Sequence, residues 1–260
     1  MRFCLPIIRL FFLLLCLLTL HLGAFGGEAL LTNSLAQADA AKKRGDFDEA
    51  LKIYDAAQQT QTNNAAGLCT LSRCYCDLTY MTNSADVQKD LVTRALSCAK
   101  QAVSDDPSNA TAHASLAVCY AKSCNFADIK TELTYSRLFK EEAEKAIALD
   151  PKQDVAYYLL GRWNYGIANA GFVARTYVKV IYGGLPQASL ADAITNFQEA
   201  CTIAPDRILN HAGLAMAYDA TGDKKSEIAE LQKCCALKPL GPEDQDAVHD
   251  AKKKLDMLQQ

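Results

Sequence analysis

The sequence is poor in the residues that carry most enzyme and metal chemistry. Only four of its 260 residues are histidine, and it contains no Cys-x-x-Cys, Gly-x-Ser-x-Gly, His-Glu-x-x-His or P-loop motif. The sequence therefore lacks the usual motifs of a zinc site, a hydrolase and a nucleotide-binding enzyme. His113 and His211 occupy the same position of a repeated pattern, so they are predicted to be packing residues. We predict a protein that is not an enzyme and needs no metal or cofactor.

An excess of basic charge is also missing. The chain has 27 lysines and arginines against 30 acidic residues. Without residues 1–26, which hold Arg2 and Arg9, the balance becomes 25 against 30, a net charge near −5. A nucleic-acid-binding protein needs a basic face, so nucleic acid is not expected as a partner. No polybasic segment is present either, and membrane contact is expected only through an uncleaved N-terminal leader.

Only the N-terminus carries a long apolar run. Arg2 and Arg9 precede an apolar core over residues 10–20, which is shorter than the ~20 residues needed to span a bilayer. Ala24 and Gly26 have the spacing that a signal peptidase reads. Residues 1–26 are therefore predicted to be a signal peptide, with an uncleaved N-terminal anchor as the alternative. The body is expected to be exported, periplasmic or secreted, or else membrane-anchored by this segment.

Cysteine is plentiful, but its pattern does not indicate a disulfide framework. Of eleven cysteines, Cys4 and Cys16 lie in the leader, which leaves an odd number of nine. Most of these nine fall inside predicted helices, where a small apolar residue packs well. A structural disulfide stays open, because an exported compartment could oxidise a pair.

A repeated pattern dominates the remainder of the chain. Helix-ending segments rich in alanine are followed by Pro107, Pro151, Pro205 and Pro239, and a Leu-small pair and an aromatic residue recur after the first three. These are the positions of the 34-residue tetratricopeptide motif. Small residues let the two helices of a hairpin approach closely, and proline ends one helix and begins the next segment. The sequence predicts an all-α, tetratricopeptide-like helical-hairpin solenoid with a right-handed superhelix.

The spacing of the prolines departs from the standard motif. They stand 44, 54 and 34 residues apart. Excesses of ten or eleven residues predict elongated middle hairpins, with the extra length shared between both helices. The excess of twenty falls on residues 166–189, interpreted either as a lid or as an extra helix at the edge. Residues 242–257 are predicted to form a C-terminal capping helix. We expect a single repeat domain over residues 30–258, with about five hairpins and the cap.

One stretch resembles a known family. Tyr157 to Tyr165, with Gly161-Arg162-Trp163 at its centre, is similar to a segment of the regulator of microtubule dynamics family. The similarity extends over roughly residues 95–258. It implies a tetratricopeptide-like fold and an adaptor role at microtubules or organelle contacts, some members carrying an N-terminal membrane segment. The signal-like leader departs from that family, and an exported body would exclude a microtubule role.

The first helix of each hairpin is expected to line the inner groove of the superhelix. Basic residues alternate there with apolar and aromatic ones, which suits an extended peptide that carries an acidic group. The alternative is that the basic residues merely pair with neighbouring acids. The predicted groove residues are Arg73, Asp77, Lys122, Tyr158, Arg162, Tyr165, Met216 and Asp219.

Two functions from different classes fit this groove. The first is a protein- or peptide-binding adaptor or scaffold. The second is a lipid or small-molecule carrier, in which residues 166–189 close an apolar cavity. A long open groove would favour the adaptor, and a closed cavity would favour the carrier.

Overall fold

The computed structural model describes residues 30–61, 64–171 and 187–258, and within these ranges every regular element is a helix. The leader predicted at residues 1–26 lies outside the described residues. A helix over residues 30–43 comes first. The elements that follow are α2 (Phe47–Thr60), α3 (Ala65–Leu78), η1 (Thr79–Met81), α4 (Ala85–Asp105), α5 (Ala110–Ser123), η2 (Cys124–Phe126), α6 (Ile129–Leu149), α7 (Asp154–Ala168), α9 (Leu190–Ile203), α10 (Ile208–Thr221), α11 (Lys224–Ala236) and α12 (Pro242–Leu258).

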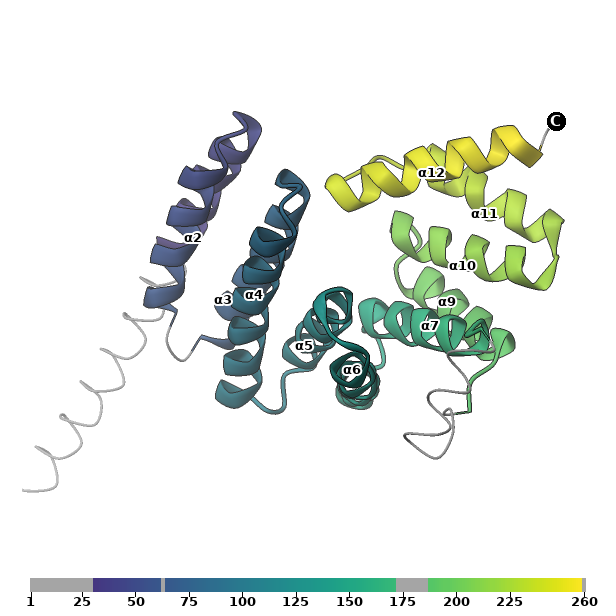
Figure 1. The fold of residues 1–260 in the computed structure, drawn as a ribbon, viewed down its shortest axis with the longest axis horizontal. Helices are drawn as coiled ribbons and strands as arrows, with labels where there is room; N and C mark the ends of the chain where they lie inside the picture. Colours follow the sequence, from purple (N-terminus) through teal and green to yellow (C-terminus); the bar gives the residue numbers. More distant parts are fainter. Residues whose placement is uncertain (1–29, 62–63, 172–186, 259–260) are drawn as a thin grey trace, which may run out of the picture.

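Successive helices pair as antiparallel hairpins and stack into one curved array. Helix α3 packs on α4, α5 on α6, α7 on α9, and α10 on α11. The first helices of neighbouring hairpins also touch, because α5 contacts both α3 and α7, and α7 contacts α10. In Figure 1 the array bends into an open arch, with α2 to α4 on one side and α10 to α12 on the other. The all-α, tetratricopeptide-like solenoid is therefore confirmed, as is its C-terminal capping helix.

The middle hairpins are elongated, but the extra length is not shared between their two helices. The first helices, α3 and α5, have 14 residues each, whereas the second helices, α4 and α6, have 21 each. The remaining extra residues form the short 3-10 turns η1 and η2 and the links after them. The first helices keep standard length because they must contact one another along the inside of the arch.

Most of the helices start at polar side-chain caps, whereas α7 and α10 start without one. Asn109 ends the loop after Pro107, and its side-chain Oδ1 accepts a hydrogen bond from the Ala112 backbone N–H at 3.0 Å. Asp128, Ser189 and Asp223 do the same for α6, α9 and α11. Such caps satisfy N–H groups that have no partner inside the helix. Where a cap occurs, it helps to fix the residue at which the helix begins.

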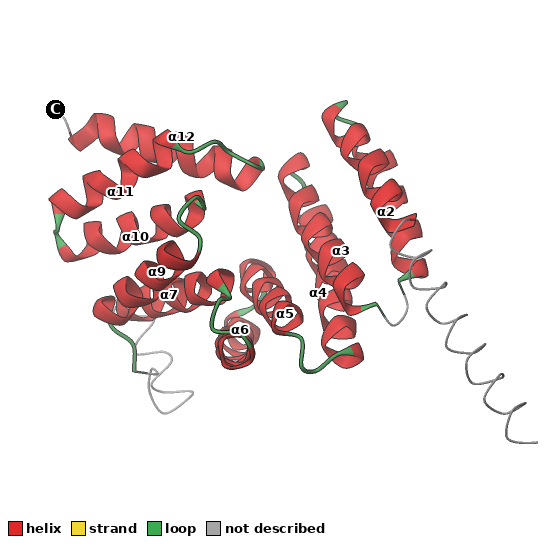
Figure 2. Cartoon of the chain, turned by 180° about the vertical axis from the view of Figure 1, so that it is seen from behind, coloured by secondary structure: helices red, strands yellow, loops and turns green. Residues whose placement is uncertain are grey.

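Small residues form the contacts between helices, and larger ones fill the gaps. Fully buried alanines recur along the stack, including Ala50, Ala99, Ala146 and Ala200. At the C-terminal end, Val248 and Ala251 of α12 pack against Leu231 and Cys234 of α11. Helix α12 thus covers the last apolar face, as a terminal element of a solenoid must. Figure 2 shows from behind that α12 lies over α11 and α10.

Candidate functional site

Several of the predicted groove residues, on α5 and α7, make polar contacts, and the charge of Glu243 acts on both Lys122 and Arg162. Lys122 ends α5, and Arg162 and Tyr158 lie one turn apart on α7. The Arg162 guanidinium donates to the Tyr158 hydroxyl at 3.1 Å, and the Tyr158 ring packs on Phe197 with 5.8 Å between ring centroids. The Lys122 ammonium lies 3.4 Å from the Tyr80 hydroxyl and 5.1 Å from the centre of its ring. We name Tyr80, Lys122, Tyr158 and Arg162 the basic patch.

A carboxylate from the capping helix faces the basic patch. The N-terminal end of α12 points toward α3 and α4 across the arch (Figure 1). Glu243, in its first turn, places a carboxylate oxygen 3.9 Å from the Lys122 ammonium. Sequence reasoning missed Glu243 and Tyr80. Nothing in the sequence shows that α12 returns to α5 and brings Glu243 close to Lys122.

The electrostatics of this region keep its cations charged. Burial lowers the pKa of Lys122, but the charge of Glu243 and the contact with Tyr80 outweigh it and raise that pKa. Interaction with Tyr158 raises the pKa of Arg162, with a smaller contribution from Glu243. Burial raises the pKa of Tyr80 to about 12. Lys122 and Arg162 therefore stay protonated at neutral pH, and the Tyr80 hydroxyl beside Lys122 stays neutral.

The remaining predicted groove residues divide into three groups. Asp77 is half-buried beside the basic patch, where burial raises its carboxyl pKa, and Arg73 is exposed one turn before it on α3. Tyr165 and Met216 pack into the cluster around Phe197. Asp219 instead links α10 to α11 and α12. Its carboxylate accepts hydrogen bonds from Lys224 of α11 at 2.5 Å and from Lys254 of α12 at 2.8 Å. Asp219 thus helps to hold the cap in place.

The buried histidines make polar contacts that the sequence did not predict, whereas the cysteines of the described residues form no disulfide. His113 and His211 are buried, but each also pairs with a buried carboxylate, Glu142 or Glu230, which sequence analysis did not anticipate. The nine cysteines of the described residues are all free thiols. In the part of the chain that the structure describes, Cys201, His211 and Glu230 form a cluster with the spacing of metal ligands.

The fold and the hairpin register define the class: a tetratricopeptide-type helical solenoid. The crystal structure of TTC0263, a thermophilic tetratricopeptide protein of Thermus thermophilus, superimposes with a TM-score of 0.60. The likeness covers 86% of this chain and 98% of that one at 18% sequence identity.

The family follows from the sequence match. The model of the family "Regulator of microtubule dynamics protein 1-3" matches residues 34–259, and the chain belongs to that family. It is 28% identical to regulator of microtubule dynamics protein 1 of Mus musculus over 173 residues, 66% of this chain and 56% of the relative. It is also 28% identical to protein 3 of Xenopus laevis over 185 residues, 69% and 39% of the two chains. The chain spans about half the length of such relatives.

Family membership corrects one prediction. Microtubules are polymers of the cell interior, and the relatives are named for regulating them. The prediction of an exported, periplasmic or secreted body is therefore wrong. It relied on residues 1–26, whose apolar run resembles a signal core. Among the described residues, no helix is both long and apolar enough to cross a membrane.

Proposed function

We propose that this chain is a non-catalytic scaffold that holds an extended segment of a protein partner on the concave side of its arch. The partner segment presents a carboxylate, either an acidic side chain or a chain terminus, to Lys122 and Arg162. Tyr80 and Tyr158 flank those cations and supply flat apolar surface. Arginine suits this role because its planar fork can bind a carboxylate through two hydrogen bonds.

The position of Glu243 is the observation that carries the proposal. Its carboxylate already lies beside Lys122, so the patch faces an anion within its own chain. The contact is loose, since the separation is 3.9 Å and the Glu243 side chain keeps 47% of its surface exposed. Exposed ion pairs of this kind contribute only ~0.2–1 kcal/mol. A partner carboxylate can therefore displace Glu243 at little cost in free energy.

The names of the relatives supply the partner to test first. Those proteins are called regulators of microtubule dynamics. We infer that the concave side binds a microtubule or a microtubule-associated protein. An acidic protein surface would complement the basic patch, and the net negative charge of the whole chain would discourage unspecific adsorption.

The test is co-sedimentation of the full chain with polymerised tubulin. The variants are Lys122→Ala and Arg162→Ala, and the matched control is Arg137→Ala, an exposed arginine on α6 that pairs with Glu141. We expect the two patch variants to sediment at least tenfold more weakly, while the control sediments like the unaltered chain. Equal sedimentation of all three variants would remove the basic patch from the proposal. No sedimentation of the unaltered chain would remove polymerised tubulin as the partner.

The carrier function receives no support from the described residues. Residues 172–186 of the expected lid lie outside them. One cavity among the described residues, of about 410 Å³, is bordered by Cys201, in the last turn of α9. Residues 187–189, the end of the expected lid, precede the first turn of α9, at the opposite end of the helix.

A further inference from the structure

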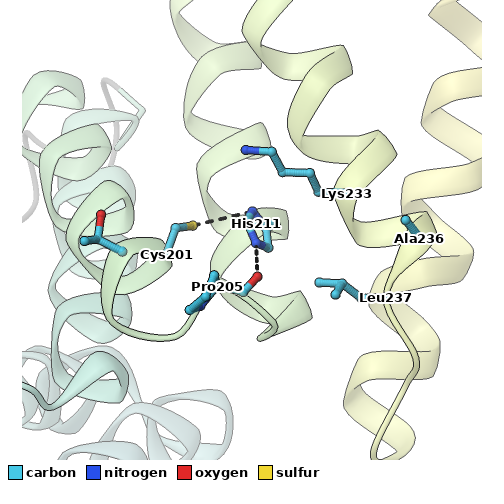
Figure 3. A pocket seen from close by; sticks show the side chains of 7 residues that line it. Cys201, Pro205, His211, Lys233, Ala236 and Leu237 are labelled. Atoms are coloured by element: carbon cyan, nitrogen blue, oxygen red, sulfur yellow. Dashed lines mark hydrogen bonds between the residues drawn. The ribbon is translucent and has the colours of Figure 1, made fainter.

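The imidazole of His211 makes two hydrogen bonds that fix its orientation. Its Nε2 lies 2.7 Å from the Pro205 carbonyl oxygen, and its Nδ1 lies 2.6 Å from a carboxylate oxygen of Glu230. A carbonyl oxygen only accepts hydrogen bonds, so Nε2 carries hydrogen and points away from α11. Nδ1 is consequently the nitrogen that faces the interior of the α9–α10–α11 junction. Figure 3 shows one ring nitrogen of His211 joined to Cys201 and the other to the Pro205 carbonyl oxygen.

The same arrangement occurs in an earlier hairpin. His113 Nε2 lies 3.0 Å from the Pro107 carbonyl oxygen, and its Nδ1 lies 2.5 Å from Glu142. A lysine three residues after each glutamate also repeats, with Lys145 on Glu142 at 2.7 Å and Lys233 on Glu230 at 2.8 Å. We call this arrangement the histidine clasp. Because it is repeated, the clasp alone is explained by the architecture of the hairpin.

Cys201 distinguishes the second clasp from the first. It stands four residues before Pro205, where the earlier hairpin has Val103 four residues before Pro107. Its Sγ lies 3.6 Å from Nδ1 of His211, the same nitrogen that Glu230 approaches. One N–H group makes one strong hydrogen bond. The bond from Nδ1 to Glu230 therefore explains the position of Glu230 but not that of the Cys201 thiol.

The three ligand atoms have the spacing of a metal site. Cys201 Sγ, His211 Nδ1 and a Glu230 oxygen all lie within 4.8 Å of one another. Around tetrahedral Zn²⁺, with Zn–S of ~2.3 Å and Zn–N of ~2.0 Å, sulfur and nitrogen are separated by about 3.5 Å. The sulfur–nitrogen distance already matches this value. The nitrogen–oxygen distance must open by about 0.8 Å, which a small rotation of the Glu230 side chain provides.

We propose that Cys201, His211 and Glu230 form a binding site for a zinc-class transition-metal ion. The ion takes the place of the hydrogens on Nδ1 and on the thiol, and both leave to solvent as protons. A thiolate and a carboxylate then balance the two positive charges of the ion. The Pro205 carbonyl, which accepts from Nε2, is the outer partner that orients a metal-binding histidine. None of these residues belongs to the basic patch.

The surroundings leave a fourth position open. Cys201 and His211 border the cavity of about 410 Å³, together with Pro205, Lys233 and Leu237. This cavity gives the ion a path of entry and room for a water molecule or an external ligand. A cysteine–histidine nucleophile pair fits less well. Its imidazole needs the thiol on one nitrogen and the orienting group on the other, whereas here the thiol and the carboxylate share Nδ1.

The test uses the full chain, reduced and stripped of metal with a chelator. Zinc affinity is measured by competition with a chromophoric chelator, and Co²⁺ is added separately to look for the charge-transfer absorption of a cobalt–thiolate bond. The variant is Cys201→Val, which installs the residue of the first clasp and leaves His211 and Glu230 in place. The control is Cys124→Ser, a partly exposed thiol in another hairpin. Circular dichroism verifies that both variants are folded.

We expect the unaltered chain and Cys124→Ser to bind one ion and to show the cobalt–thiolate band. Changes to outer partners of metal ligands already weaken binding by about 10- to 100-fold. Cys201→Val should therefore weaken zinc binding by at least about 100-fold and abolish the band. The proposal is overturned if the unaltered chain binds no zinc, or if Cys201→Val binds it as well as the unaltered chain does.

Discussion

At the scale of single residues, one aromatic ring determines which side chains two helices can carry. Phe197 of α9 is completely buried between α7 and α10. A Cβ atom at Gly161 would come within 2.7 Å of the Phe197 ring, and one at Gly213 within 2.4 Å. Real Cβ atoms essentially never approach another heavy atom this closely without a covalent link, and the Phe197 ring is fully buried. Both glycines are required because the ring passes directly over their backbone.

Two alanine substitutions should therefore have opposite effects. Gly213→Ala is expected to lower the free energy of unfolding by about 1–3 kcal/mol, because it overpacks the core. Gly166→Ala lies in α7 with nothing within 4 Å of its Cβ position, and should raise that free energy by about 0.5–1 kcal/mol. Urea unfolding followed by circular dichroism measures both. Effects of the same sign would show that Phe197 can move aside.

Asp77 provides a prediction about pH. Its carboxyl pKa is raised by burial, and Lys42, Arg73 and Lys122 only partly offset this effect. The folded state therefore binds the Asp77 proton more tightly than the unfolded state, and ionisation of Asp77 opposes folding. Asp77→Asn should be more stable than the unaltered chain at pH 7, and the difference should shrink as pH falls through the folded pKa. Urea midpoints at several pH values measure this. A difference that grows in acid would contradict the assignment.

At the scale of elements, the histidine clasp connects three parts of a hairpin. The His113 ring joins the loop at Pro107, the first helix α5 and the second helix α6. Glu142 is buried on α6 and accepts from both His113 and Lys145. The clasp fixes the distance between the helices where the alanines alone would allow them to slide.

Neutralising the buried carboxylate should loosen this hairpin. Glu142→Gln removes the carboxylate that His113 and Lys145 contact, and we expect it to lower the free energy of unfolding by about 1.5–3 kcal/mol. The control is Glu144→Gln, an exposed glutamate on the same helix that pairs with Lys140. Exposed pairs contribute less than about 1 kcal/mol, so this variant should change little. Equal effects in urea unfolding would mean that His113 acts only through packing.

The sequence predicted the helices and hairpins better than the side-chain contacts between them. The recurrence of alanine and proline gave the hairpins and their register, because those residues act on their own neighbours in the chain. Glu142 is 29 residues from His113, and Glu230 is 19 residues from His211. No local spacing marks such pairs. For the same reason a metal site was excluded, since Cys201, His211 and Glu230 come from three helices.

At the scale of the whole molecule, the capping helix does more than cover an apolar face. Helix α12 reaches α10 through Lys254, which contacts Asp219, and reaches α5 through Glu243. Lys254 also lies 3.4 Å from the buried carboxylate of Glu227 on α11. The two contacts of Lys254 hold α12 on α10 and α11, while Glu243 approaches α5 across the opening of the arch. Sequence analysis placed the helix correctly but could not show which way it turns.

Removal of the cap should affect the molecule unevenly. A chain that ends at residue 239 lacks Val248 and Ala251 and exposes the apolar cluster of α11. Because each hairpin of a solenoid is stabilised mainly by its neighbours, α10 and α11 should lose most of their protection against hydrogen exchange. Helices α4 to α6 should keep theirs. Mass-spectrometric hydrogen exchange distinguishes the two regions, and a uniform loss along the chain would show that the solenoid unfolds as one unit.

The hairpins of the solenoid are held together by different kinds of contact. The hairpins α5–α6 and α10–α11 are each held by an imidazole bonded to a carboxylate, whereas the hairpin between them has Tyr157 six residues after its proline and is held by the Phe197 ring. A hydrogen bond fixes direction as well as distance, whereas the packing of a phenyl ring on two glycines is not directional. The hairpins that carry a clasp should therefore resist rotation of one helix against the other more than the hairpin between them does. Any adjustment in the curvature of the arch, and with it in the width available to a partner, should occur first at the α7–α9 hairpin.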